Sequence, residues 1–191
     1  INTWEGTGDS IGFRGFGGGG KVKLYARRPD QRAMVITYEA KGRDATVRNF
    51  DGKIGWTKTP INIIGEHLLA GAELDGIKLD AQMMFPTQIK TALKRLRTID
   101  PQDIDDKPMV VVQGNGPGSI VASLFFDKET GLLRRVIRYG DSPIGRMPTQ
   151  FDYSDYREVN GVKVPFHIEF LWLDGREGLQ FSEVKANTTI D

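Results

Sequence analysis

The chain has 191 residues, 39% hydrophobic and 27% charged, which is long enough for one well-filled core and hardly enough for two, so we expect a single domain over residues 1–191. Its 26 Lys and Arg residues against 25 Asp and Glu give a formal net charge of +1, so no general attraction to nucleic acid is expected. The absence of cysteine excludes disulfides, thiolate zinc sites and covalent c-type haem attachment.

The sequence contains no apolar run of 18 residues and no signal-peptide pattern, so no transmembrane segment is predicted in this chain. It begins at Ile1 rather than at a methionine. We interpret the chain as a processed or truncated product whose targeting segment, if it had one, is missing.

Most of the chain alternates short apolar runs with turn dipeptides. Asp51-Gly52, Asn160-Gly161 and Asp174-Gly175 are hairpin signals, because these pairs tolerate the positive φ angles of a type I′ turn. The expected strands are 3–8, 21–28, 33–39, 46–50, 54–58, 109–113, 119–127, 132–139, 150–159, 163–173 and 178–188. About eleven antiparallel strands in meander order, with one helical insert, predict an α+β fold built on a strongly curved half-barrel sheet.

A glycine-rich stretch, "GFGGGGK" at residues 15–21, fits the spacing of a phosphate-binding loop. Such a loop opens a helix, and its lysine is followed by Ser or Thr. Here Val22 follows Lys21, and "KVKLYARR" alternates as a strand does. A flexible loop between the first two strands is therefore favoured over a nucleotide site.

The strand pattern is interrupted between residues 64 and 99. The stretches "EHLLAGAELDGIKLDAQMMF" and "TQIKTALKRLRTI" have helical spacing, with Pro86 between them. This insert is expected to cover the concave face of the sheet through its apolar side chains, which are Leu68, Leu69, Leu74, Ile77, Leu79, Met83, Met84 and Phe85.

Two later strands indicate which faces are buried. In "VPFHIEFLW", Phe166, Ile168, Phe170 and Trp172 share one face and form the predicted core side. In "SIVASLFF" both faces are apolar, with Phe125 opposite the main row, so that strand is expected to be covered on both sides.

Side chains for catalysis or metal binding are sparse. His67 and His167 lie one hundred positions apart and outside any ligand-spaced cluster, so a structural role is favoured for each, although a Ser-His-Asp triad stays open. The acidic run "IDPQDIDDK" lacks the Gly and Glu of a calcium loop and is interpreted as a solvated connection between helix and strand. No catalytic residue, metal site or cofactor is predicted.

Basic residues form a candidate docking patch for an anionic partner. Lys90, Lys94 and Arg97 are near one another at helical spacing, and Arg134 and Arg138 share a strand face. A solvated surface is the alternative interpretation for each group.

The order "FDGKIGWTKTP", "LLAGAELDGIKLDAQ", "LFFDKETGLLRRVIRY", "PTQFDYSDYREVNGVKVPFHIEF" and "SEVKANTTID" resembles the outer-membrane lipoprotein-sorting (Lol-type periplasmic lipoprotein carrier) superfamily. The hairpins at 126–135 and 155–166 are the most specific parts of this resemblance. It implies a half-barrel closed by helices around an apolar cavity, in a periplasmic protein peripheral to a membrane. The start "NTWEGTG" departs from the family pattern, which places a helix before the first strand.

Two functions follow as hypotheses. The first is a non-enzymatic domain that binds a lipid or acyl chain in a cavity lined by Leu68, Leu74, Met83, Met84, Phe85, Phe125 and Trp172. Similar domains occur fused to c-type cytochromes of the photosynthetic reaction-centre kind, which implies the alternative. That alternative is an accessory or scaffold subunit of a membrane-bound electron-transfer complex, with no ligand of its own. An enzyme is the third and weakest reading.

Overall fold

The computed structural model describes residues 1–12, 19–39, 44–60, 64–173 and 175–190. The strands before the helices are β1 (Thr3–Ser10), β2 (Gly20–Arg27), β3 (Gln31–Tyr38), β4 (Thr46–Phe50), β5 (Gly55–Lys58) and β6 (Glu66–Leu68). The helical segments are α1 (Gly71–Met83), η1 (Pro86–Gln88) and α2 (Ile89–Ala92). The later strands are β7 (Lys94–Ile104), β8 (Lys107–Asn115), β9 (Val121–Asp127), β10 (Leu133–Ser142), β11 (Gly145–Val159), β12 (Val162–Trp172) and β13 (Gly175–Ala186).

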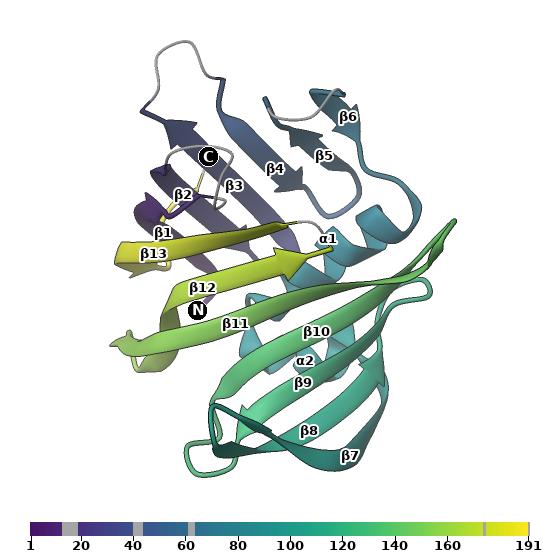
Figure 1. Ribbon diagram of the computed structural model, residues 1–191. Coiled ribbons are helices and arrows are strands. Elements are labelled where there is room, and N and C mark those ends of the chain that lie inside the picture. Colours follow the sequence, from purple (N-terminus) through teal and green to yellow (C-terminus); the bar gives the residue numbers. More distant parts are fainter. Residues whose placement is uncertain (13–18, 40–43, 61–63, 174, 191) are drawn as a thin grey trace.

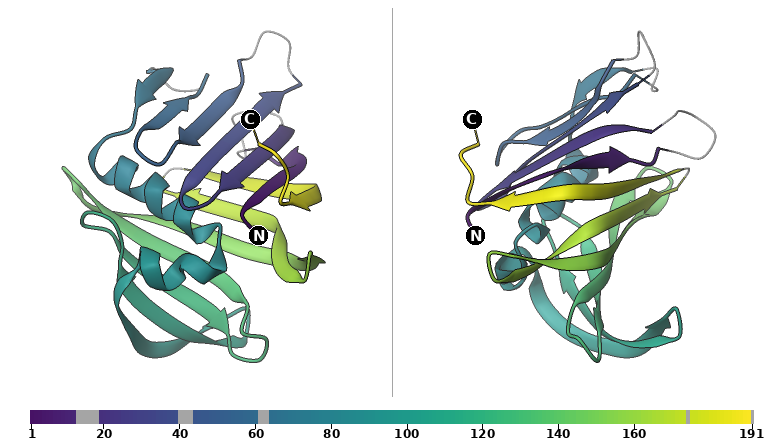
Figure 2. Two further views of the ribbon diagram at one scale, coloured as in Figure 1. Left: turned by 180° about the vertical axis from the view of Figure 1, so that it is seen from behind. Right: turned by 90° about the vertical axis from the view of Figure 1, so that its left-hand side faces the viewer.

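Within the described ranges the strands form one open antiparallel sheet of thirteen strands, in the order β6-β5-β4-β3-β2-β1-β13-β12-β11-β10-β9-β8-β7. The sheet bends around α1 and α2, which lie inside its concavity (Figures 1 and 2). The predicted α+β half-barrel with a helical insert is therefore confirmed. Pairing of β1 with β13 joins the two halves of the chain at the middle of the sheet.

All eleven expected strands are present, and the two additional strands, β6 and β7, are the edges of the sheet. Both come from the segment expected to be helical. The helical insert is shorter than predicted, because α2 ends at Ala92 and residues 94–99 belong to β7. The prediction of a helix through these residues is wrong: Leu93 is buried, but Leu96 is 38% exposed on a strand rather than packed beside it on a helix.

The hairpin turns follow the dipeptides that predicted them. Asn160 and Gly161 have φ angles of 49° and 75°, as a type I′ turn requires. At the β4–β5 turn, the Asp51 carboxylate accepts hydrogen bonds from the amides of Lys53 and Ile54, both at 2.7 Å. Asp174, in the third dipeptide, lies outside the described residues.

The acidic run forms a different connection from the one expected. Asp105 and Asp106 have φ angles of 50° and 58° and join β7 to β8 as a tight hairpin turn. The connection therefore runs between two strands and not between a helix and a strand. Its carboxylates are exposed on this turn, as a solvated connection requires.

The core lies between the concave face and the helices. β1, β2, β12 and β13 contribute one cluster, in which Trp4 and Phe181 meet edge to face at 6.1 Å between ring centroids. Gly6 makes room for this pair, because a Cβ there would lie 2.9 Å from the Phe181 ring. β9 is buried on both faces, as expected: Leu124 faces α1, and Phe125 faces away from it beside Met109 and Val111.

Most of the glycine-rich stretch, residues 13–18, lies outside the described residues. Lys21 is described and belongs to β2, where it pairs with Asp9 on β1. The segment after the glycines is therefore a strand, as its alternation predicted, and provides no helix N-terminus for a phosphate.

Candidate functional site

Helix α1 lies against β10 through a row of small side chains. Ala72 approaches Gly140 so closely that a Cβ added to the glycine would lie 3.2 Å from the Ala72 Cβ. One turn further along the helix, a Cβ on Gly76 would lie 2.5 Å from the Arg138 guanidinium. Glycine is needed there because the guanidinium occupies the space where a side chain would start. The helix backbone can thus approach the sheet closely.

A buried ion pair fastens the middle of α1 to the sheet. Arg138 donates to both carboxylate oxygens of Asp80, from Nε at 2.8 Å and from Nη2 at 3.0 Å. The two side chains are 8% and 9% exposed. The Arg138 guanidinium also lies 5.9 Å from the centre of the Phe151 ring, at cation–π distance. This two-point contact fixes how α1 is seated.

A small cavity lies beside this pair, between α1 and the concave face. Its lining is Leu24, Arg32, Leu79, Asp80, Met83, Met84, Val136, Phe151, Tyr153, Ile168, Phe170 and Leu179. The centre of a water molecule can move within about 20 Å³, enough for about one water. In this conformation the space between α1 and this part of the sheet is therefore almost filled by side chains.

The polar part of the lining consists of Arg32, Asp80 and Tyr153. Arg32 is 8% exposed, and its Nε is buried without a hydrogen-bond partner. Burial lowers the pKa of Arg32 to about 10 and also lowers the pKa of Arg48, on the neighbouring strand. Burial raises the pKa of the Tyr153 phenol well above its ordinary value. Burial around Arg32, Arg48 and Tyr153 thus disfavours any charge that has no partner of opposite sign.

A row of aromatic rings leads from the cavity to solvent. Phe151 and Phe170 are stacked at 6.0 Å between ring centroids, and Phe170 and Trp172 at 5.2 Å. The first two rings line the cavity, whereas Trp172 is 40% exposed at the end of β12. The row therefore provides a continuous apolar path along the concave face.

The structure separates the seven residues expected to line a ligand cavity. Met83 and Met84 line the cavity, and Trp172 ends the aromatic row that leaves it. Phe85 and Leu74 are not in the lining and pack into neighbouring core clusters. The other two, Leu68 and Phe125, are remote: Leu68 is 66% exposed on an edge strand, and Phe125 is buried on the opposite face of β9.

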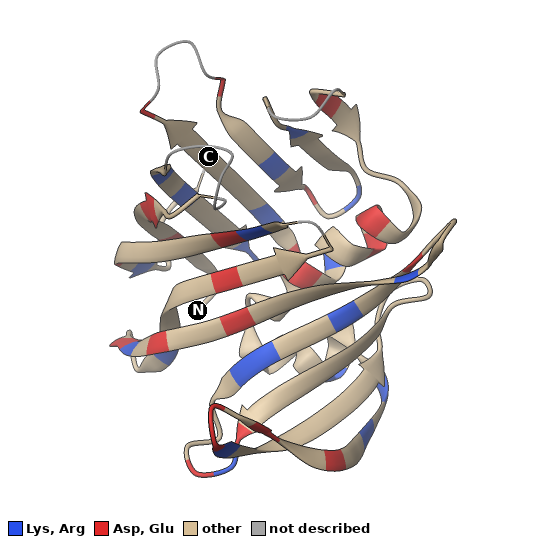
Figure 3. Cartoon of the chain, viewed as in Figure 1, with Lys and Arg blue, Asp and Glu red and all other residues tan. Residues whose placement is uncertain are grey.

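The five basic residues do not form one patch. Arg138 is buried in its pair with Asp80, and Arg134 is half-buried. Lys94 and Arg97 are exposed on β7, next to Lys90 on α2. Positive charges and Pro101 along an edge strand discourage pairing with another chain, which gives Lys94 and Arg97 a structural role. Across the sheet both signs of charge are spread over many strands (Figure 3).

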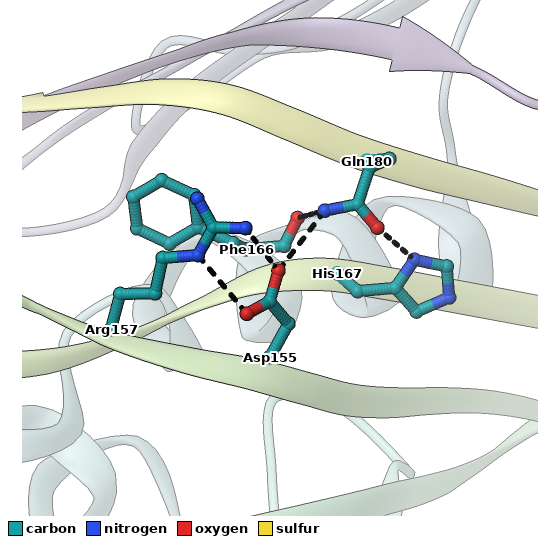
Figure 4. A network of polar contacts seen from close by, with 5 residues as sticks. All are labelled: Asp155, Arg157, Phe166, His167 and Gln180. Atoms are coloured by element: carbon teal, nitrogen blue, oxygen red, sulfur yellow. Dashed lines mark hydrogen bonds and ion pairs between the residues drawn. The ribbon is translucent and has the colours of Figure 1, made fainter.

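His167 belongs to a polar network on the outer side of the sheet (Figure 4). Its Nδ1 lies 3.1 Å from Gln180 Oε1, and Gln180 donates to Asp155 Oδ2 and to the Phe166 carbonyl, both at 3.2 Å. Asp155 also accepts from Arg157, which lies 4.4 Å above the Phe166 ring. The amide between the carboxylate and the imidazole cannot relay a proton as a base would, so the network links β11, β12 and β13 structurally.

His67 is placed between β6 and the first turn of α1. Its Nε2 lies 4.0 Å from Glu73 Oε2, a distance at which the imidazole and the carboxylate attract when the histidine is protonated. Over the described ranges, no three His, Cys, Asp or Glu side chains are grouped as metal ligands. The two histidines are 100 positions apart in the chain and on different parts of the sheet.

Sequence reasoning missed Arg32 and Asp80. A signal for Arg32 was present, because Arg32, Met34 and Ile36 alternate with more exposed residues and so share the buried face of β3. A cationic residue among the alternating apolar residues of a strand indicates a buried charge. Asp80 lies one helical turn after Gly76. Gly76 leaves space for the Arg138 guanidinium, and Asp80 provides the carboxylate that binds it.

Comparisons with known proteins bear on the fold. No protein-family model matches the chain, and no curated protein sequence matches it. Among solved structures it is similar to a LolA superfamily protein from Nitrosomonas europaea, with a TM-score of 0.63 and 14% identity over 99% of this chain and 87% of that one. A putative outer membrane lipoprotein-sorting protein domain from Vibrio parahaemolyticus has a TM-score of 0.62 and 10% identity over 100% and 87%.

A third similar structure is a DUF1329 family protein from Desulfovibrio piger, with a TM-score of 0.57 and 11% identity over 100% of this chain and 88% of that one. At these identities the likeness shows a shared fold. The half-barrel implied by the sequence resemblance is thus also the fold of lipoprotein-sorting domains. No helix among the described residues is both long and apolar enough to cross a membrane.

Proposed function

We propose that this chain is a non-enzymatic, extracytoplasmic domain, peripheral to a membrane, which binds a hydrophobic ligand between α1 and the concave face of the sheet. The observation that supports this most is the cavity under α1, where two methionines meet stacked aromatic rings that continue to the rim. Methionine and aromatic side chains adapt to apolar ligands of irregular shape. The similar fold of the lipoprotein-sorting protein domain from Vibrio parahaemolyticus is consistent with the binding of a hydrophobic ligand.

Binding requires α1 to move, because the cavity in this conformation holds about one water. Beyond its packing against the core, α1 is held by two polar contacts. Asp80 pairs with Arg138 near the middle, and Arg28 donates to Thr87 just after the helix. Arg28 also lies 5.2 Å above the Phe85 ring. Displacement of α1 as a unit would join the cavity to the aromatic row.

A disulfide between α1 and β10 tests this opening directly. The chain has no cysteine, so the variant Ala72→Cys/Gly140→Cys contains one pair only. The expected Cβ separation of 3.2 Å is slightly shorter than the usual range for disulfides, so a small backbone adjustment suffices. The oxidised variant should lose binding of a fluorescent fatty acid, and the reduced form should regain it. Ala72→Cys alone, oxidised in the same way, is the matched control.

Equal binding in the oxidised and reduced forms would show that the ligand does not enter beneath α1. Lipid extraction and mass spectrometry of the purified protein provide a second measurement that needs no variant. A lipid that co-purifies with the parent protein and not with the oxidised double variant would support the proposal. Failure of the reduced variant to bind any lipid, with the parent also inactive, would overturn it.

A second function is favoured by one observation, which is that side chains almost fill the space between α1 and the part of the sheet that it faces. An accessory subunit of a membrane-bound complex needs no cavity and would retain this packing in use. It would bind no lipid in either redox state of the cross-linked variant. It would instead co-purify with membrane proteins, which native mass spectrometry detects.

A further inference from the structure

The interior beneath α1 contains more arginines than carboxylates. Three guanidinium groups, from Arg32, Arg48 and Arg138, are near one buried carboxylate, that of Asp80, and Arg48 is also attracted by the exposed carboxylate of Glu73. Both oxygens of this carboxylate are already bound by Arg138. Among the described residues, neither Arg32 nor Arg48 forms an ion pair within 4.0 Å of a carboxylate, unlike Arg138.

Arg32 and Arg48 face the same space. Arg48 on β4 is paired with Met34 on β3, and Met34 is two positions from Arg32, so all three side chains share the concave face. Arg32 lines the cavity and is 8% exposed. The Nε atoms of both arginines are buried without hydrogen-bond partners. Arg32 donates a weak hydrogen bond from Nη2 to the Met34 sulfur at 3.9 Å.

An unpaired buried guanidinium is unfavourable, because it loses hydration without gaining an anion. The planar group offers several N–H donors in a fixed geometry that matches a carboxylate or a phosphate. The lining of the same cavity is largely apolar and includes Leu24, Met84 and Leu179. The site thus combines unused donors for an oxyanion with a surface suited to a hydrocarbon chain.

We propose that Arg32 and Arg48 bind the acidic head of a single-chain lipid, whose tail lies along Met84, Phe170 and Trp172 toward the rim. This inference rests on the proposed function and names its ligand class: an amphiphile with an oxyanion head, carboxylate or phosphate, that enters head first. The head supplies an acceptor for the buried Nε atoms of both arginines. The aromatic row supplies contacts for the tail.

The test compares palmitate, hexadecanol and inorganic phosphate by displacement of a fluorescent fatty probe and by calorimetry. The parent protein should bind palmitate at least tenfold more tightly than hexadecanol, which has the same chain length and no charge. Arg32→Met should bring the ratio of palmitate affinity to hexadecanol affinity most of the way to one. Arg48→Met should change this ratio in the same direction. Arg146→Met removes an exposed arginine and is the matched control, which should keep the preference.

The outcomes separate the two proposals. Equal affinity of the parent protein for palmitate and hexadecanol would overturn the anionic head and leave the carrier function standing. Binding of neither lipid would overturn the carrier function and this inference with it. Binding of phosphate alone, dependent on Arg32, would overturn the lipid head, because the site would then accept a free anion. If Arg32→Met fails to fold, the ratio of palmitate affinity to hexadecanol affinity in the parent protein still tests whether the site prefers an anionic head.

Discussion

Replacement of Asp80 by alanine is the sharpest test of how α1 is held. Asp80 accepts two hydrogen bonds from Arg138, at 2.8 and 3.0 Å, and both side chains are more than nine-tenths buried. Removing one member of such a pair leaves a buried charge without compensation, which costs about 3 to 5 kcal/mol. The loss should be at the upper end here, because Arg32 and Arg48 already place positive charge nearby.

Urea unfolding followed by tryptophan fluorescence measures this loss. With an m-value of about 3 kcal/mol per molar urea, a loss of about 4 to 5 kcal/mol lowers the midpoint of Asp80→Ala by about 1.3 to 1.7 M relative to the parent protein. The matched control is Asp152→Ala, which breaks a pair of the same geometry, with Arg135, on a less buried face of the sheet. Since those side chains are 27% and 29% exposed, its loss should be only about 1 kcal/mol.

A double replacement separates charge from packing. Asp80→Leu combined with Arg138→Met removes both charges and fills the same space with apolar atoms, so its stability should be within about 1 kcal/mol of the parent protein or above it. A loss for Asp80→Ala no larger than that of Asp152→Ala would refute the reasoning. It would mean that water reaches Arg138 and that α1 is not sealed against the sheet.

Three further changes test other parts of the structure. Gly76→Ala gains helix propensity of about 1 kcal/mol, but its methyl group would lie 2.5 Å from the Arg138 guanidinium. We therefore expect a net loss of stability of about 1 to 3 kcal/mol in urea titrations, and a gain in stability would contradict this expectation. Arg32→Met should leave the melting temperature of the protein without lipid unchanged or higher, because the buried Nε of Arg32 has no hydrogen-bond partner to lose. A clear fall in the melting temperature would show that Arg32 stabilises the fold through another contact. Backbone amides of Thr130 and Glu129 lower the pKa of Asp127 below 3.8, so its contribution to stability is present above about pH 4 and lost as pH falls through the lowered value. Asp127→Asn should flatten that acid limb in thermal melts, and an unchanged limb would argue against the turn contact.

The fold was largely predictable because alternation and turn chemistry act locally. The dipeptides Asp51-Gly52 and Asn160-Gly161 form the hairpins they indicate. The edge strand β7 was not predictable in this way, because most of its side chains are exposed on both faces and no period of two marks a core side. Leu93 and Leu96, three positions apart, imitate a helix, and Arg95, with a φ angle of 52°, lies where the register of β7 shifts.

The candidate site was predictable only in its apolar part. Met83 and Met84 were expected to line a ligand cavity from within the helical insert, and both line the small cavity beneath α1. Arg138 was expected on a surface patch, since a charged residue on a strand is usually solvated. Whether that charge meets Asp80 instead depends on the close approach of α1 to β10. That approach is a tertiary contact between residues 58 positions apart, and no local pattern reports it.

Under the proposed function, the apolar packing of α1 sets the fraction of molecules in which the site is open. Ile77 and Leu79 of α1 are almost fully buried, and exposing them would cost about 3 to 6 kcal/mol. An open form of that free energy is present in roughly one molecule in a hundred to one in ten thousand, and this fraction weakens the apparent affinity of any ligand by the same factor. Each methylene group that a ligand buries contributes about 0.8 kcal/mol, so a chain of about eight carbons offsets the opening. The tail of the ligand therefore supplies the free energy that separates α1 from the sheet. The unpaired guanidinium of Arg32 then discriminates between ligands whose tails are equal.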